Sequence, residues 1–230
     1  MINDPKIFGL AFLGGIVPSL LWLWFWLKED KKKLEPKGLI AAVFLMGMVA
    51  VVFVLPIQKF IQAHIGSHEL QLFLWASAEE LLKFIAVILV IYKTNYDDQP
   101  IEWPIYMITA AVGFAALENA LFLIKPISIG ETAVSLLTGH LRFLGATLLH
   151  SVSSGILGIA LGLSFYMKGL KRKWYLLLGF AGAIALHSLF NFFIMRNKGV
   201  DFLKVFAFLW VVSIILMLLF ERVRRMSNIN

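Results

Sequence analysis

Two adjacent carboxylates lie inside a long apolar stretch of the sequence. Glu79 and Glu80 fall near the middle of residues 70–92, a run that is otherwise largely hydrophobic apart from Lys83. About 20 apolar residues are enough to cross a bilayer, and an acidic residue at the centre of a spanning helix costs about 3 kcal/mol on insertion scales. Lys83 follows Glu79 by four residues, the spacing of a helical ion pair, so it can offset one charge. We therefore expect the pair to face an interior cavity and to do chemistry there.

Further polar residues lie within other apolar stretches. They are Glu118 and Asn119 in 103–124, His150 in 139–167, and His187 and Asn191 in 174–195. Counted from the outer end of each predicted span, the ionisable groups fall about 10–17 Å deep at 1.5 Å per residue. Because four separate helices place their ionisable groups at one level, we expect these groups to form a single site.

Carboxylates and imidazoles that are buried together can activate water. A carboxylate can act as a general base, and an imidazole or amide can stabilise a developing oxyanion. His187 and Asn191, one helical turn apart, are candidates for that pair of donors. The sequence favours glutamate-activated water, because no two histidines share a helix with the H-E-x-x-H spacing of zinc proteases. Which of Glu79 and Glu80 is the base stays open.

A metal ion is the alternative means of activating water. Carboxylate and imidazole ligands suit zinc, iron or manganese, and Zn²⁺ is the candidate cofactor. The predicted ligands are Glu79, Glu118, His150 and His187. A separate pair, His64 and His68, has ligand spacing but lies in a loop at the predicted outer surface.

The composition predicts a membrane protein. Of the 230 residues 60% are hydrophobic, with 20 Phe and 7 Trp, and long apolar blocks alternate with short charged loops. We expect an all-α transmembrane bundle in one domain, residues 1–230, with the site among spans three to six. Residues 126–138 are expected to form a loop, and the first block a retained helix. The seven predicted spans are about 5–27, 38–61, 70–92, 103–124, 139–167, 174–195 and 202–220.

The net charge of +7 is concentrated in the loops between spans. Such charge determines topology, so it does not indicate nucleic-acid binding. More lysines and arginines fall on the side of the C-terminus, which predicts a cell-membrane protein with its N-terminus outside and its C-terminus in the cytoplasm. Arg142, at the outer end of the fifth span, is expected to reach toward the membrane surface, and binding of a substrate carboxylate is the alternative. The chain has no cysteine, which excludes disulfides and thiolate metal sites.

Four motifs occur in order along the middle of the chain. They are Glu79-Glu80-x-x-Lys83, Phe114-x-x-x-Glu118-Asn119, His150 in a glycine-rich stretch, and His187-x-x-x-Asn191. The ordered set resembles the PrsW family of intramembrane proteases, which is related to the CAAX prenyl endopeptidases and the Abi group.

The resemblance implies hydrolysis of a membrane-anchored protein in or near the bilayer, with an anti-sigma factor as the type of substrate. It implies that Glu79, Glu80, Glu118, His150 and His187 are catalytic-site residues, and that Lys83, Phe114 and Asn119 support them. The related CAAX enzymes have histidine where this chain has Glu118, which makes a prenylated substrate less suitable.

Three other classes of function remain compatible with the sequence. Buried carboxylates also serve as relays in proton- or cation-coupled transporters, although the chain shows no repeated halves. His150 and His187 could instead be the axial ligands of a b-type haem. A non-catalytic membrane scaffold is the third alternative.

Overall fold

The protein is helical throughout the part of the chain that the structure describes. The computed structural model describes residues 4–28, 36–92, 94, 96, 98–196 and 202–227, without the side chains of Arg196 and Phe202. Within these residues there are α-helices and one π-helical turn, and no strand. In chain order they are α1 (Pro5–Lys28), α2 (Lys37–His64), α3 (His68–Ile91), α4 (Glu102–Ser128), α5 (Thr132–Leu141), the π-helical turn η1 (Arg142–Ala146), α6 (Thr147–Leu163), α7 (Leu170–Arg196) and α8 (Phe202–Met226). The predicted all-α class is confirmed.

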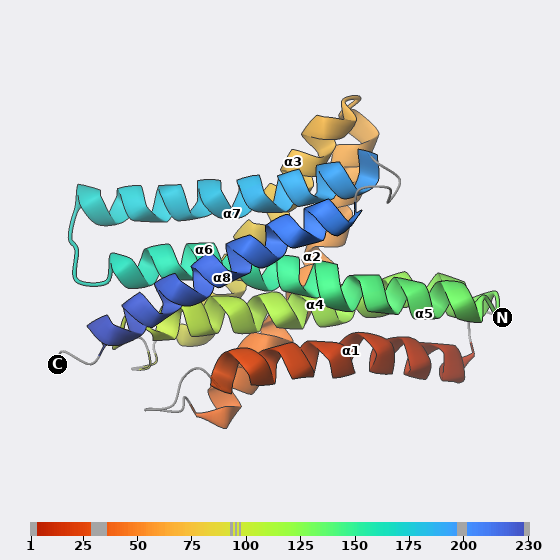
Figure 1. Cartoon of the computed structure of the whole chain (residues 1–230), viewed down its shortest axis with the longest axis horizontal. Coiled ribbons are helices and arrows are strands. Elements are labelled where there is room, and N and C mark those ends of the chain that lie inside the picture. The colour runs from red at the N-terminus through yellow and green to blue at the C-terminus, as the bar shows by residue number, and fades with distance from the viewer. Residues whose placement is uncertain are drawn as a thin grey trace.

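The helices fall into two groups by direction. In Figure 1, α1, α4, α6, α7 and α8 run roughly along the long axis of the molecule, and α5, η1 and α6 form one continuous rod. Helices α2 and α3 form a hairpin that is inclined to the others. Helix α1 begins at one end of the long axis and α8 ends at the other.

Six segments are long and apolar enough to cross a membrane: α1, α2, α4, the rod 132–163, α7 and α8. The predicted third span corresponds to α3, which is 24 residues long. Helix α3 is not among the six, because every stretch of it that could cross contains Glu79, Glu80 and Lys83. Even without α3, the six segments confirm the prediction of a multi-pass helical membrane protein.

The predicted loop at 126–138 is wrong in extent. Helix α4 continues through Pro126 to Ser128, and α5 begins again at Thr132. The chain reverses at Gly130, whose φ of 75° is a left-handed conformation that glycine adopts without steric cost. Proline and glycine in the sequence suggest a long loop, whereas one tight turn suffices. The charged loop between the first two predicted spans lies mostly outside the described residues.

Helix α4 lies at the centre and is approached closely by its neighbours. A methyl group on Gly47 of α2 would overlap the carbonyl oxygen of Ala110, and one on Gly113 of α4 would overlap that of Phe44. A methyl group on Gly158 of α6 would meet the backbone of Pro104 in the same way. Glycine at these crossings lets the backbones touch, as is common between membrane helices. The close approach brings α2, α4 and α6 near enough to share side chains in one site.

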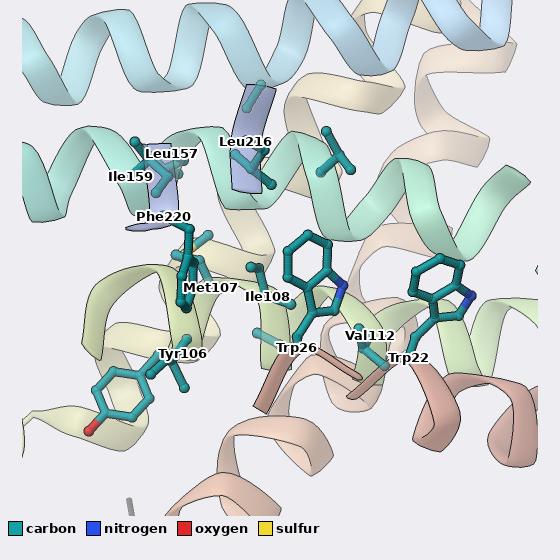
Figure 2. Packing of buried hydrophobic residues seen from close by; sticks show 14 of the residues in the cluster. Trp22, Trp26, Tyr106, Met107, Ile108, Val112, Leu157, Ile159, Leu216 and Phe220 are labelled. Carbon is teal, nitrogen blue, oxygen red and sulfur yellow. The ribbon is translucent and has the colours of Figure 1, made fainter. Parts of the chain in front are cut away.

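A hydrophobic core fills the space between α1, α4, α6 and α8. Figure 2 shows Trp22 and Trp26 of α1 in the same packed cluster as Leu216 and Phe220 of α8. Both tryptophans are buried, whereas Trp24 between them is 62% exposed. Burial of aromatic side chains this large dominates core energetics, so this cluster fixes how α1 lies against the rest.

Candidate active site

Four helices contribute the polar residues that the sequence singles out. Helix α3 supplies Glu79, Glu80 and Lys83, α4 supplies Glu118, α6 supplies His150, and α7 supplies His187. Residues three or four apart share a helix face, so the carboxylates of α3 and Lys83 point the same way. All of these side chains are buried except that of Glu118, which is 19% exposed. The structure brings the whole set together in one cluster.

Both carboxylate oxygens of Glu80 are hydrogen-bonded. Its Oε1 accepts from Lys83 Nζ at 2.8 Å and from His187 Nδ1 at 2.9 Å. Its Oε2 accepts from the Ser154 hydroxyl at 2.6 Å. Lys83 therefore offsets the charge of Glu80 more closely than that of Glu79, from which its Nζ is 4.0 Å away.

Glu79 has one oxygen held and one free. Its Oε1 accepts from the Gln58 side-chain amide at 2.8 Å. Its Oε2 is buried and has no hydrogen-bond partner among the described residues. That oxygen lies 3.6 Å from His187 Nε2 and 3.9 Å from His150 Nδ1. A buried polar atom without a partner is costly, so this oxygen is the one most available for chemistry.

The hydrogen bonds of the two histidines assign their protons. Lys83 Nζ can only donate, and it lies 2.9 Å from His150 Nδ1, so this nitrogen accepts and the proton sits on Nε2. His150 Nε2 then donates to Glu118 Oε2 at 3.1 Å. In His187 the proton is on Nδ1, which donates to Glu80, and Nε2 carries a lone pair. Each imidazole is thus held by a different carboxylate.

The cluster has the features of a cation site. Glu79 Oε2 and His187 Nε2 face each other with lone pairs, and three carboxylates are offset by only two cationic side chains, Lys83 and Arg142. Glu79, His150 and His187 each offer a ligand atom, and these atoms lie within 4.8 Å of one another. Ligands about 2.1 Å from a tetrahedral zinc ion lie about 3.4 Å apart.

The residues fit a metal ion if the ligand atoms move slightly closer together and Lys83 gives up one contact. The separations of 3.6 Å and 3.9 Å between Glu79 Oε2 and the two imidazole nitrogens exceed that spacing by a few tenths of an ångström. His150 Nδ1 can be a ligand only if Lys83 Nζ gives up its contact with that nitrogen. Lys83 would keep its ion pair with Glu80.

A second layer surrounds Glu118. Arg142 Nη2 pairs with Glu118 Oε2, and Arg142 Nε donates to Asn119 Oδ1 at 2.6 Å. Phe114 packs against His150 with ring centroids 5.3 Å apart, and Lys83 Nζ lies 4.5 Å from the centre of the Phe114 ring. The residues predicted to support the site therefore contact it directly or through Arg142.

Three predicted polar residues lie apart from this cluster. Asn191 is one turn beyond His187 and half-buried, and no hydrogen bond among the described residues joins it to the carboxylates. His64 and His68 are exposed near the α2–α3 turn, where His64 Nδ1 approaches the Phe60 carbonyl oxygen. Within the described chain they belong to no group of metal-ligating side chains.

Sequence reasoning misses two residues that contact the site and misjudges a third. Gln58 holds Glu79, and its only sequence signal is an amide near the end of an apolar span. Ser154 is in sequence only a small residue on the His150 face, yet it donates to Glu80. The prediction that Arg142 reaches the membrane surface is wrong, because its side chain turns inward to Glu118.

The family comparison covers most of the chain. Residues 35–219 match the family model described as PrsW family intramembrane metalloprotease. The chain is 28% identical over 188 residues to Protease PrsW of Geobacillus kaustophilus, covering 80% of this chain and 79% of that protein. It is 27% identical over 205 residues to Protease PrsW of Oceanobacillus iheyensis, with 87% and 91% covered. Protease PrsW of Bacillus subtilis is 25% identical over 207 residues, with 85% and 88% covered. No solved structure matches the chain.

The matched region contains every helix of the cluster. It runs from just before α2 almost to the end of α8, and the resemblance drawn from the four ordered motifs is confirmed. The relatives are matched over most of their own length, so the likeness concerns whole proteins and not one segment. The chain belongs to the PrsW family, and it is a multi-pass intramembrane protease.

Proposed function

We propose that Glu79, His150 and His187 bind a zinc ion, and that this centre hydrolyses a peptide bond of a membrane-anchored protein. The observation that carries the proposal is the convergence of three electron-rich atoms: Glu79 Oε2, His187 Nε2 and His150 Nδ1. Two histidines and a glutamate, with a fourth position left to water, are a set of ligands typical of catalytic zinc. The description of the matching family as metalloproteases also supports a metal.

The outer hydrogen bonds support the same assignment. A histidine that ligates a metal almost always donates its other ring N–H to a carboxylate, a carbonyl or water. His187 donates to Glu80, and His150 donates to Glu118. Gln58 holds the remaining oxygen of Glu79. Each proposed ligand is therefore oriented by a partner of its own.

The bound ion would supply Lewis acidity that lowers the pKa of water, so that a nucleophile able to attack a peptide carbonyl is available near neutral pH. Lys83 and Arg142 would balance the charges of Glu80 and Glu118, so that Glu79 is the carboxylate left to face the reacting groups. His187 has its proton committed to Glu80. Of the two donors that the sequence predicts for the oxyanion, only Asn191 then remains, and it would have to act from one turn beyond His187, outside the cluster.

A second candidate mechanism needs no metal. The contact of Lys83 Nζ with His150 Nδ1 favours it, because that contact occupies the lone pair a metal would need. Glu79 Oε2 would then take a proton from the attacking water, as glutamate-activated hydrolysis requires. Both mechanisms depend on the same free oxygen, and they differ in their response to a chelator.

The type of substrate and the orientation are part of the proposal. An anti-sigma factor is the substrate type implied by the family resemblance, and the charge distribution supports a cell-membrane protein with its N-terminus outside. Because the chain lacks cysteine, a single Gly66→Cys or Lys168→Cys substitution can be labelled cleanly. An impermeant thiol reagent should label Gly66→Cys in intact cells, and label Lys168→Cys only after permeabilisation. The reverse pattern would show the opposite orientation.

The test is cleavage of a single-pass substrate by purified protein in liposomes. Glu79→Gln should slow cleavage by at least about a hundredfold, the lower range for loss of acid–base catalysis. Glu69→Gln changes an exposed glutamate of the same helix and should leave the rate unchanged. Chelation should abolish cleavage if zinc is used and spare it if Glu79 acts alone. Cleavage by Glu79→Gln at the rate of the parent would exclude both mechanisms.

A further inference from the structure

The π-helical turn η1 changes the register of the rod that carries His150. Residues 142–146 form one π turn, in which the Thr147 backbone N–H donates to the Arg142 carbonyl oxygen five residues back. Arg142 and His150 are eight residues apart, and at 100° per residue an unbroken α-helix would set them about 80° apart around the axis. A π turn accommodates one extra residue, which reduces the offset to about 20°. The turn thus places Arg142 on the same face as His150.

Arg142 is tied into a closed set of hydrogen bonds on that face. It pairs with Glu118 and donates from Nε to Asn119 Oδ1 at 2.6 Å. Asn119 Nδ2 donates to Thr147 Oγ1 at 2.9 Å, and the Thr147 hydroxyl donates to the Arg142 carbonyl oxygen at 3.2 Å. The same Glu118 oxygen that binds Arg142 accepts from His150 Nε2. Arg142 and His150 therefore share one acceptor.

Helix α1 holds the π turn from the other side. The indole Nε1 of Trp22 donates to the Phe143 carbonyl oxygen at 3.0 Å, and the Trp22 and Phe143 rings lie 5.9 Å apart. Trp22 is 8% exposed and belongs to the main hydrophobic core. In an ordinary α-helix the Thr147 N–H would donate to the Phe143 carbonyl oxygen, but here it donates to Arg142. Trp22 supplies the Phe143 oxygen with a donor instead, which stabilises the altered register.

We propose that Arg142 is a positioning residue for the reaction: through Glu118 it fixes the His150 ring so that Nδ1 faces Glu79, and the π turn held by Trp22 places it there. The inference rests on the proposed function, in which His150 Nδ1 is a ligand. It does not rest on Arg142 touching the substrate. The Arg142 side chain is only 16% exposed, and its Nε and Nη2 atoms are already engaged.

Two alternative roles make different predictions. An arginine that bound a substrate carboxylate would affect KM and leave metal affinity unchanged. An arginine that only stabilised the fold would lower the melting temperature without changing the state of His150. A positioning residue acts on His150 through Glu118, so its loss leaves the mostly enclosed Glu118 carboxylate without its counter-charge and releases the His150 ring.

The experiment compares purified full-length variants for zinc affinity, cleavage and histidine ¹⁵N spectra. Arg142→Gln should lower zinc affinity by up to about 10- to 100-fold, the range for loss of a ligand's partner, because Glu118, the partner of His150, is no longer held. It should lower kcat with KM nearly unchanged. Arg142→Lys keeps the charge but not the planar fork, so it should recover part of the loss. Arg225→Gln removes an exposed arginine paired with Glu221 and should change nothing.

Two more measurements test the role of Arg142, one on the Trp22 contact and one on the His150 tautomer. Trp22→Phe should reproduce part of the effect of Arg142→Gln, whereas Trp24→Phe, at an exposed neighbour, should not. In metal-free protein, His150 should show the Nε2-protonated tautomer, and Arg142→Gln should lose that single state. If Arg142→Gln does not fold, Arg142→Lys and Trp22→Phe decide the matter by the same measurements.

The outcomes separate this inference from the proposed function. Failure of the parent protein to bind zinc would remove the metal mechanism, yet the His150 spectra would still test positioning. Unchanged His150 signals and unchanged zinc affinity in folded Arg142→Gln would overturn the inference. A raised KM with normal zinc affinity would instead assign Arg142 to the substrate.

Discussion

Glu79 and Glu80 are neighbours in the sequence, but their carboxylates have different surroundings. Glu80 accepts three hydrogen bonds, from Lys83, His187 and Ser154. Glu79 accepts one, from Gln58, and its other oxygen is free beside the two histidines. A fully hydrogen-bonded carboxylate is suited to orient its neighbours, whereas one with a free oxygen can bind an ion or take a proton. Under the proposed function, Glu80 is therefore the orienting residue of the pair and Glu79 the reacting one.

Gln58 provides a test at this scale. Gln58→Leu replaces the amide by an apolar group of similar size and removes the hydrogen bond that holds Glu79 Oε1. Cleavage should fall by about 10- to 100-fold, the range seen when the partner of a ligand is lost. Gln62→Leu, one turn further along the same helix and exposed, is the control. Equal rates for the two variants would mean that Gln58 does not orient Glu79.

The site depends on how closely the helices approach α4. Gly47 and Gly113 face each other's helix at the α2–α4 crossing, and neither position has room for a methyl group. The same helix α2 carries Gln58 to Glu79. We therefore expect the crossing to contribute to function as well as to stability.

The corresponding prediction concerns Gly113→Ala. The added methyl group would overlap the Phe44 carbonyl oxygen and force the two helices apart. The free energy of unfolding should fall by about 1–3 kcal/mol, as for other overpacked positions, measured by denaturation in detergent. Gly9→Ala, where nothing lies within 4 Å, should have no such cost. Similar stabilities for both variants would show that the crossing is not tightly packed.

The whole molecule shows which features the sequence can predict. Hydropathy and segment length are sufficient to predict the all-α membrane class and most of the helices, because a spanning helix needs about 20 apolar residues whatever its partners are. The loop at 126–138 is overestimated because Pro126 and Gly130 mark a turn without giving its length. The candidate site residues can be selected from the sequence by their charge within apolar stretches and by their depth, because the cost of placing a charge in the membrane applies to each helix separately.

Contacts between distant segments cannot be predicted in the same way. Gln58 and Glu79 are 21 residues apart, and Arg142 and Glu118 are 24 residues apart. Which side chains meet depends on helix rotation and on the π turn at 142–146, and no local pattern in one sequence encodes that turn. These contacts become visible only once the helices are placed against one another.

Zinc binding by the purified chain tests the central claim most directly. The account predicts about one zinc ion per chain in the parent protein, and loss of that ion in His187→Gln, because three ligands hold a catalytic zinc. His140→Gln, which changes an exposed histidine outside the cluster, should retain the ion. Absence of zinc from the parent after incubation with it, or equal zinc content in His187→Gln, would contradict a metal centre formed by Glu79, His150 and His187.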